Sequence, residues 1–220
     1  MLIARNRIRL GLVAVAVTAI PVAANATAKE PAAPAPPEQI VPYYEGGEYA
    51  ADLKKATDAA TKSLKSQLAK KPKKPAIVFD IDDTLESTYR CAKAKNFDRQ
   101  AISICQAQND QDPIAPVWKL LKYAQKKKVA LFIITARPVG IEPGTKQKLK
   151  EDGLKGKYTL VMRPNADFGK PAKPFKTAER KKIQKKGYKI LVNIGDQKSD
   201  IDGGASVKKF KVPNPMYLTP

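Results

Sequence analysis

The sequence predicts an α/β fold in which a parallel sheet is flanked by helices. Short apolar runs alternate along the chain with segments whose apolar residues recur every three or four positions. The first pattern is typical of buried strands and the second of amphipathic helices. Because the two patterns alternate, parallel strands joined by helical crossovers are expected. The chain has 220 residues, enough for one domain with its own hydrophobic core.

The elements follow in a clear order. The first is a helix over residues 48–70, which Pro72 and Pro75 end. Residues 86–116 have no regular pattern and hold both cysteines, Cys91 and Cys105. Strands are expected over 76–79, 129–134, 158–162 and 188–194, with a short fifth over 210–212, and further helices over 117–128, 145–152 (capped by Thr145) and 177–186.

The amino terminus has the layout of a secretory signal peptide over residues 1–28. A basic start with three arginines precedes an apolar run over 10–20, and two A-x-A cleavage sites follow at 24–26 and 26–28. The alternative is an uncleaved signal anchor. Because the apolar run is shorter than the ~20 residues of a membrane span, no stable span is expected. The predicted location is therefore secreted, that is, periplasmic or extracellular.

A linker rich in Pro and Ala is expected over residues 29–47, extended and without a folded element. The folded domain is then predicted over 48–220. Because the protein is expected to be exported, a disulfide between Cys91 and Cys105 is favoured over two buried free thiols.

The composition excludes several kinds of catalysis. Histidine is absent, which rules out Ser-His-Asp and Cys-His catalysis and His-ligated zinc. Lys and Arg number 41 against 21 Asp and Glu, for a formal net charge of +20. Such a lysine-rich surface predicts weak attraction to polyanions, and no specific nucleic-acid motif is present.

Acidic residues cluster at two predicted strand ends. Neighbouring carboxylates repel each other and persist where a cation compensates them. An all-oxygen ligand set favours a hard ion, Mg²⁺ before Ca²⁺. Within the first cluster, Asp80 and Asp82 can face one pocket, where one attacks phosphorus and the other moves protons. The clusters comprise Asp80, Asp82, Asp83 and Glu86, then Asp196, Asp200 and Asp202.

Four segments resemble, in order, the signature motifs of haloacid dehalogenase superfamily phosphatases, and most of all their secreted acid phosphatase branch, which includes the class B enzymes and plant vegetative storage proteins. The resemblance implies a Rossmann-like sheet, with residues 86–116 as a small cap inserted after the first motif. The four segments are 79–84 with its D-x-D-x-T pattern, 133–137 with Thr135, 175–180 with Lys176, and 195–200 with its G-D-x-x-x-D pattern.

The resemblance also implies roles for the matching residues. Asp80 would be the nucleophile and a Mg²⁺ ligand, and Asp82 the general acid and base, with its backbone carbonyl on the metal. Thr135 and Lys176 would hold the phosphoryl group, although Lys173 competes with Lys176 for this role. The other two carboxylates are Asp196, a further Mg²⁺ ligand, and Asp200, which would support Asp196 or Lys176.

The expected function is a secreted, Mg²⁺-dependent phosphomonoesterase that acts on small phosphate esters through an aspartyl phosphate. Four alternatives stay open: a calcium-binding turn at Asp80 and Asp82, a storage-type or binding relative without catalysis, a basic protein that binds polyanions, and a phosphotransferase that uses the same intermediate. Asp83, Glu86 and Arg137 are expected near the site and outside its chemistry, and Asp202 is expected to cap a turn or helix.

Overall fold

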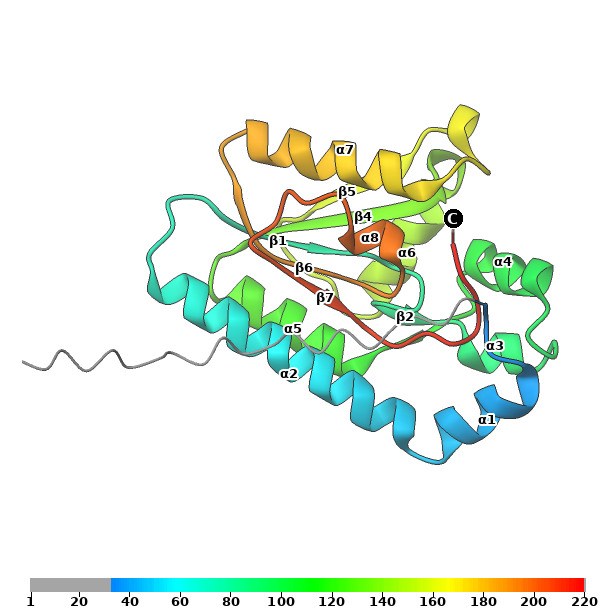
Figure 1. Cartoon of the computed structure of the whole chain (residues 1–220). Helices are drawn as coiled ribbons and strands as arrows, with labels where there is room; N and C mark the ends of the chain where they lie inside the picture. Colours follow the sequence, from blue (N-terminus) through cyan, green and yellow to red (C-terminus); the bar gives the residue numbers. More distant parts are fainter. Residues whose placement is uncertain (1–32, 220) are drawn as a thin grey trace, which may run out of the picture. The chain divides into compact units, whose positions relative to one another are not determined.

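A computed structural model describes residues 33–219, and a five-stranded parallel sheet lies at its centre (Figure 1). The strand order is β5-β4-β1-β6-β7, and every neighbouring pair runs parallel, which confirms the predicted fold class. The strands are β1 (Pro75–Phe79), β4 (Ala130–Pro138), β5 (Thr159–Arg163), β6 (Lys189–Gly195) and β7 (Lys208–Lys211). Strand β7 starts two residues before the expected position.

Helices cover both faces of this sheet. Along β1, Ile77 and Phe79 face one apolar cluster, and Ala76 and Val78 face the other, as the two-residue period of a strand requires. The first face packs against α2 (Glu48–Ala69) and α5 (Ala115–Lys126), and the second against α7 (Ala172–Lys185) (Figure 1). Each fully buried aliphatic or Phe side chain stabilises the fold by about 1.5–3 kcal/mol.

Three helices begin earlier than the sequence suggested, and of these α5 starts two residues before the expected position. Helix α6 (Glu142–Glu151) starts three residues before Thr145, which is buried within the helix and does not cap it. Pro143 stands in its first turn, where a missing backbone N–H costs nothing. Helix α7 starts after Pro171, five residues before the expected position.

The prediction of an unfolded linker is wrong for residues 37–45, which form α1 (Pro37–Glu45). Pro37 occupies the first turn, which proline tolerates, and Ile40 is buried. Tertiary burial thus overrides a composition typical of linkers. Ile40 packs in a cluster with Ala92, Ile102, Met216 and Tyr217. The expected signal peptide, 1–28, and linker residues 29–32 lie outside the described residues.

Residues 86–116 are more regular than expected and are called the insert below. They contain α3 (Tyr89–Lys93) and α4 (Arg99–Gln108), and a disulfide joins Cys91 of α3 to Cys105 of α4 with a Cα–Cα distance of 6.1 Å. A short antiparallel pair, β2 (Glu86–Ser87) and β3 (Asp112–Pro113), closes the insert at its base.

The carboxyl ends of β1, β4 and β6 lie side by side at one edge of the sheet. The chain adds β4 and then β5 on one side of β1, and β6 and β7 on the other. Ligands of open α/β sheets bind at such a reversal of strand order. The same edge carries η1 (Val139–Ile141), η2 (Asn165–Asp167) and α8 (Lys198–Ile201).

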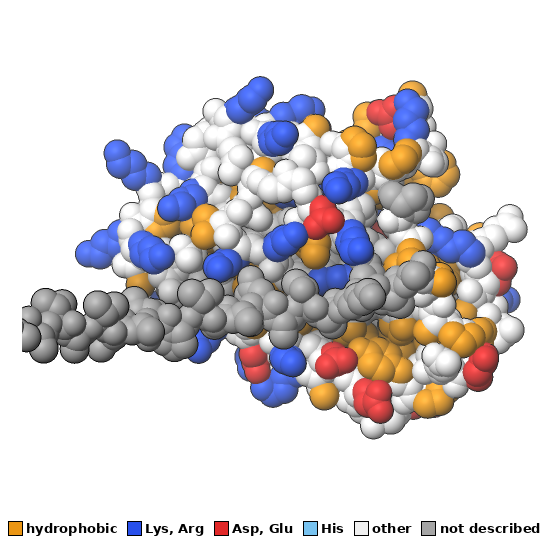
Figure 2. All heavy atoms as spheres, in the orientation of Figure 1, with side chains coloured by type: hydrophobic (Ala, Val, Ile, Leu, Met, Phe, Trp, Pro, Cys, Tyr) orange, Lys and Arg blue, Asp and Glu red, His pale blue; other side chains and the backbone are white. Residues whose placement is uncertain are grey.

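The excess basic charge is spread over the surface of the face shown in Figure 2. Lys and Arg side chains are scattered over the face in Figure 2 and do not gather in one patch there. Among the helices of the described residues, none is both long enough and apolar enough to cross a membrane.

Candidate active site

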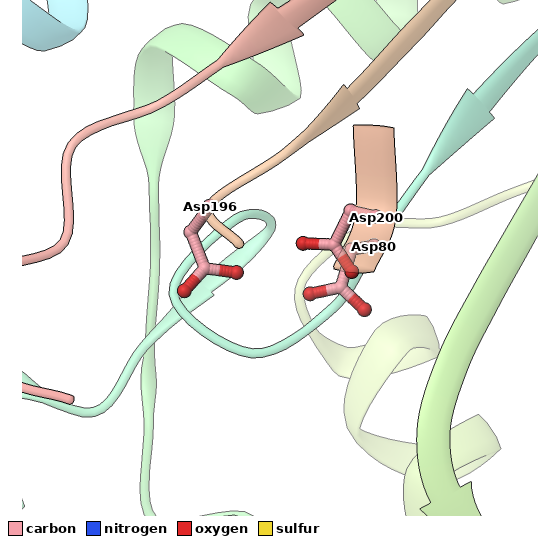
Figure 3. A group of neighbouring side chains, drawn as sticks. All are labelled: Asp80, Asp196 and Asp200. Carbon is pink, nitrogen blue, oxygen red and sulfur yellow. The ribbon is translucent and has the colours of Figure 1, made fainter. Parts of the chain in front are cut away.

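Three buried carboxylates meet at the carboxyl edge of the sheet. Asp80 directly follows β1, Asp196 directly follows β6, and Asp200 lies in α8. One oxygen from each lies within 4.8 Å of the others. Figure 3 shows Asp80 and Asp200 side by side, with Asp196 facing them from the neighbouring strand end. All three side chains are buried, so their charges are poorly solvated.

Lys176 is the cation within this carboxylate cluster. It projects from α7, is itself buried, and places its Nζ 2.6 Å from Asp80 Oδ1 while also pairing with Asp200. Lys173 lies one turn earlier on α7, is 54% exposed, and has its Nζ 3.9 Å from Asp202. The geometry therefore distinguishes the two lysines and brings only Lys176 to Asp80.

One lysine leaves this cluster with an excess of negative charge. The pKa of Asp80 is raised to about 7, chiefly by burial, which Lys176 opposes and the neighbouring Asp200 and Asp82 reinforce. Burial also raises the pKa of Asp196 well above its usual range, with Asp200 and Asp80 adding to it. The all-oxygen donor set suits a hard divalent cation, which would offset this repulsion.

The fourth motif has a steric reason for its glycine. Asp200 folds back over the end of β6, and its Oδ2 accepts a hydrogen bond from the backbone N–H of Gln197 at 2.8 Å. A Cβ on Gly195 would lie 2.3 Å from the Cβ of Asp200, a distance that real side chains do not tolerate. Gly195 is thus required for Asp200 to reach Lys176.

Asp196 is held by hydrogen bonds from three side chains. Thr84 Oγ1 donates to Oδ1 at 3.3 Å, and Oδ2 accepts from Gln197 Nε2 at 2.6 Å and from Asn214 Nδ2 at 2.7 Å. These donors fix the carboxylate's orientation and favour its charged form. Sequence reasoning missed Asn214, because no motif marks the C-terminal tail, and gave no role to Gln197, which occupies a variable position of the fourth motif.

The same tail reaches the base of the insert. The hydroxyl of Tyr217 donates to Asp83 Oδ2 at 2.7 Å and accepts from Gln106 Nε2 at 3.2 Å. Burial raises the pKa of Asp83 to about 6, which the donors Thr88 and Tyr217 oppose. Asp83 therefore lies near the site, where it accepts hydrogen bonds from Thr88 and Tyr217, and its exclusion from the chemistry stays a prediction.

Asp82 forms an ion pair with Arg137, which the sequence placed near the site but outside its chemistry. Arg137 Nη2 lies 2.8 Å from Asp82 Oδ1, and its Nε lies 3.1 Å from Oδ2. The guanidinium is almost fully buried, and Asp82 is 15% exposed. Thr135 lies two residues earlier on β4, is also buried, and accepts a hydrogen bond from the backbone N–H of Arg137 at 3.2 Å.

A cavity of about 350 Å³ opens above these residues. Its floor holds Asp80, Asp82, Lys176 and Asp196, and the residues after Thr135 form part of its wall. The insert contributes one side and the segment around η2 another, where Phe168 is 66% exposed. The wall and rim include Arg99, Gln106, Ala136, Arg137, Arg163, Phe168 and Lys170.

Comparison with known proteins identifies the family of the chain. The sequence model of the family described as HAD superfamily, subfamily IIIB (acid phosphatase), matches residues 4–220. Acid phosphatase 1 of Solanum lycopersicum is 26% identical over 186 residues, which cover 82% of this chain and 73% of that protein. Vegetative storage protein 1 of Arabidopsis thaliana is 34% identical over 89 residues, 40% of this chain and 33% of its own length.

Solved structures show the same fold. The class C acid phosphatase from Bacillus anthracis superposes with a TM-score of 0.68 at 20% identity, covering 83% of this chain and 86% of that one. The same enzyme with tungstate bound gives a TM-score of 0.67. Because the family match spans nearly the whole sequence, the chain belongs to the acid phosphatases of HAD superfamily subfamily IIIB and is a phosphatase.

Proposed function

We propose that this phosphatase is a secreted, Mg²⁺-dependent phosphomonoesterase that acts on small phosphate esters through an aspartyl phosphate on Asp80. One observation carries the proposal: Asp80 lies on the floor of a cavity, with Lys176 2.6 Å away and Asp196 in the same cluster. A nucleophile, a cation for phosphoryl oxygens and a surplus of carboxylates are thus together at one strand edge.

In the first step, the Asp80 carboxylate attacks the phosphorus of the ester. A bond forms between Asp80 and phosphorus, and the ester P–O bond breaks with its electron pair on the leaving oxygen. Asp82 gives its proton to that oxygen, so a neutral alcohol departs. Lys176 and Thr135 are proposed to hold the phosphoryl oxygens meanwhile.

In the second step, Asp82 takes a proton from a water molecule, whose oxygen attacks phosphorus. The bond from phosphorus to Asp80 breaks, and inorganic phosphate is released. Asp82 then carries the proton that the next leaving group needs. An alcohol that took the place of water would give phosphotransfer by the same route.

The residues at hand fit a magnesium ion. Asp80, Asp196 and the backbone carbonyl of Asp82 would hold it, and Asp200 would stay paired with Lys176. A bound Mg²⁺ neutralises charge that builds on the phosphoryl oxygens and weakens repulsion between the phosphate and Asp80. Asn214 and Gln197 would keep Asp196 turned toward the cluster.

Export is proposed on two grounds. The amino terminus has the pattern of a signal peptide, and the structure contains a disulfide, which persists in oxidising compartments. We further propose that the insert acts as a cap over the cavity and limits the size of the leaving group.

A storage role is the second candidate, because part of the chain resembles vegetative storage proteins. Asp80 and Asp82 both remain in this chain, which favours catalysis. A storage protein would not hydrolyse phosphate esters, whether or not it binds them.

The test is phosphate release from p-nitrophenyl phosphate by the chain without residues 1–28, with Mg²⁺ or with EDTA. We expect turnover that needs Mg²⁺ and falls by at least about 10⁴-fold in Asp80→Asn, since loss of a nucleophile leaves only residual catalysis. The control is Asp202→Asn, whose side chain lies outside the carboxylate cluster and pairs with Lys209. Folded wild-type protein without turnover would contradict the proposal.

A further inference from the structure

We infer that Arg137 is a positioning residue for the proton transfers: with Gln111 it anchors Oδ1 of Asp82 and leaves Oδ2 as the oxygen that carries the proton. The inference rests on the proposed function, because it takes Asp82 as the general acid and base. It assigns a role to an arginine that the sequence pattern placed outside the chemistry.

The two oxygens of Asp82 have different surroundings. Oδ1 accepts from Arg137 Nη2 at 2.8 Å, from Arg137 Nε at 3.2 Å and from Gln111 Nε2 at 2.9 Å. Oδ2 has one contact among the described residues, to Arg137 Nε at 3.1 Å. Oδ1 thus has two donors of its own and shares the Nε–H with Oδ2, so Oδ2 is the atom that can exchange a proton with substrate or water.

The guanidinium that does this cannot easily turn. Its remaining N–H groups donate to Asn109 Oδ1 at 2.7 Å, to Thr145 Oγ1 at 3.3 Å and to Gln111 Oε1. All five donors of Arg137 therefore have partners, and the side chain is almost fully buried. Because every N–H of the planar guanidinium is hydrogen-bonded, the guanidinium holds the Asp82 carboxylate in one orientation.

Three of the hydrogen-bond partners of Arg137 come from other parts of the chain. Asn109 ends α4 in a left-handed conformation, with φ of 57°, and Gln111 lies just before β3, so both belong to the insert. Thr145 belongs to α6. The position of Asp82 is thus tied to the insert through one arginine, and the proposed cap would help to place the acid as well as cover the cavity.

This role predicts a loss that depends on the leaving group. An alkyl phosphate such as glycerol phosphate must have its leaving oxygen protonated, whereas p-nitrophenolate departs without a proton. Arg137→Ala is expected to lower kcat for the alkyl ester by about 10²–10³-fold and for p-nitrophenyl phosphate by less than about tenfold. KM is expected to change little for either ester, because the phosphate is held elsewhere.

Rescue tests separate positioning from general damage. Arg137→Lys should restore part of the alkyl ester activity, because one ammonium cannot replace a bidentate fork. Methylguanidinium added to Arg137→Ala should restore more, since it fits the space that the guanidinium leaves. Gln111→Leu, which keeps the size of the side chain, should give the same pattern with a smaller loss.

Asp82→Asn separates failure of the inference from failure of the proposed function. We expect the same dependence on the leaving group, with a larger loss. If Asp82→Asn lowers kcat equally for both esters, the proposed role of Asp82 is wrong. If Asp82→Asn shows the dependence but the Arg137 and Gln111 variants lose both activities equally or mainly raise KM, the inference alone is overturned.

Removal of the buried cation leaves Asp82 poorly compensated and weakens the fold. If Arg137→Ala does not fold, the ratio of the two activities in Arg137→Lys and Gln111→Leu decides. An unchanged ratio in both of these folded variants would overturn the inference.

Discussion

Two acidic clusters lie near the same end of the sheet, each with a single lysine, and they differ in how their charge is compensated. The open cluster holds Asp80, Asp196 and Asp200 around Lys176, and of these Asp80, Asp196 and Lys176 line the cavity floor. The closed cluster holds Glu86 and Asp152 beside Lys148, and none of these three lines the cavity. The closed cluster lies where the insert meets α6.

The closed cluster is compensated by a proton. Lys148 Nζ lies 2.5 Å from Asp152 Oδ2 but 3.5 Å from Glu86 Oε2, and within residues 33–219 neither oxygen of Glu86 accepts a hydrogen bond. Burial, together with the neighbouring Asp152, raises the pKa of Glu86 to about 9. Glu86 therefore stays neutral at pH 7.

The open cluster is arranged differently, because donors hold its carboxylates in place for a ligand. Lys176 bridges two of them, and Asn214, Gln197 and Thr84 orient the third. The comparison teaches that buried negative charge alone does not make a metal site. Access from a cavity and carboxylates oriented by hydrogen-bond donors are what favour a cation over a proton.

The largest expected effect would break this contrast at one of the proposed metal ligands. Asp196→Asn should weaken Mg²⁺ binding by at least about 100-fold and abolish turnover, because a charged oxygen ligand is lost. Titration calorimetry with Mg²⁺, without substrate, measures the affinity. Asp152→Asn in the closed cluster is the matched control and should bind Mg²⁺ as wild type does. Equal effects of the two variants would contradict the distinction.

Removing the lysine of the open cluster tests how far it compensates the carboxylates. Lys176→Met should lower the free energy of unfolding by about 3–5 kcal/mol in EDTA, because it leaves buried carboxylates without their partner. Mg²⁺ should raise the Tm of this variant more than that of wild type, since the cation takes over part of the compensation. A variant as stable as wild type in EDTA would show that the pair contributes little.

The closed cluster predicts a stability effect with a defined pH dependence. In wild type, Glu86 is protonated when folded and ionised when unfolded between pH about 4.5 and 9, so the folded state loses stability as pH rises through this window. Glu86→Gln cannot ionise and should be more stable than wild type by about 1–3 kcal/mol near pH 8, with a smaller gain near pH 5. Denaturant unfolding at both pH values checks it; a gain that does not grow with pH would refute the assignment.

The smallest effect concerns the C-terminal tail. Asn214→Ala removes one donor from Asp196 and should weaken Mg²⁺ binding by about tenfold while the fold is kept, as is common for partners of metal ligands. The measurement is the same titration, with Asn165→Ala, far along the chain at η2, as a control. Unchanged Mg²⁺ affinity in Asn214→Ala would remove the tail from the site.

The sequence predicted well where the strands lie along the chain and which of them carry the motifs, because buried strands and phosphate-site motifs are local patterns. Asp80 and Asp196 directly follow the strands that were expected to carry them. Whether Lys176 or Lys173 reaches the site could not be decided, since the two lie one helical turn apart and only packing orients them. The catalytic roles of Asp80, Asp196 and Lys176 stay predictions.

Other features depend on contacts between distant segments, and no local pattern marks them. Helix α1 has the composition of a linker and folds because Ile40 is buried against the insert and the C-terminal tail. Asn214 reaches Asp196 from 18 residues away, and Arg137 reaches Asp82 from 55 residues away. Arg137 is the last residue of the second motif segment, 133–137, so its position was visible, but its partner was not.

The most direct test of the account is to find the phosphoryl group on the protein. Wild-type protein with Mg²⁺ and p-nitrophenyl phosphate would be quenched in acid within the first turnovers, digested, and analysed by mass spectrometry. The account predicts a phosphorylated peptide with the group on Asp80, absent from Asp80→Asn. Turnover with no phosphorylated peptide, or with the group on another residue, would contradict it.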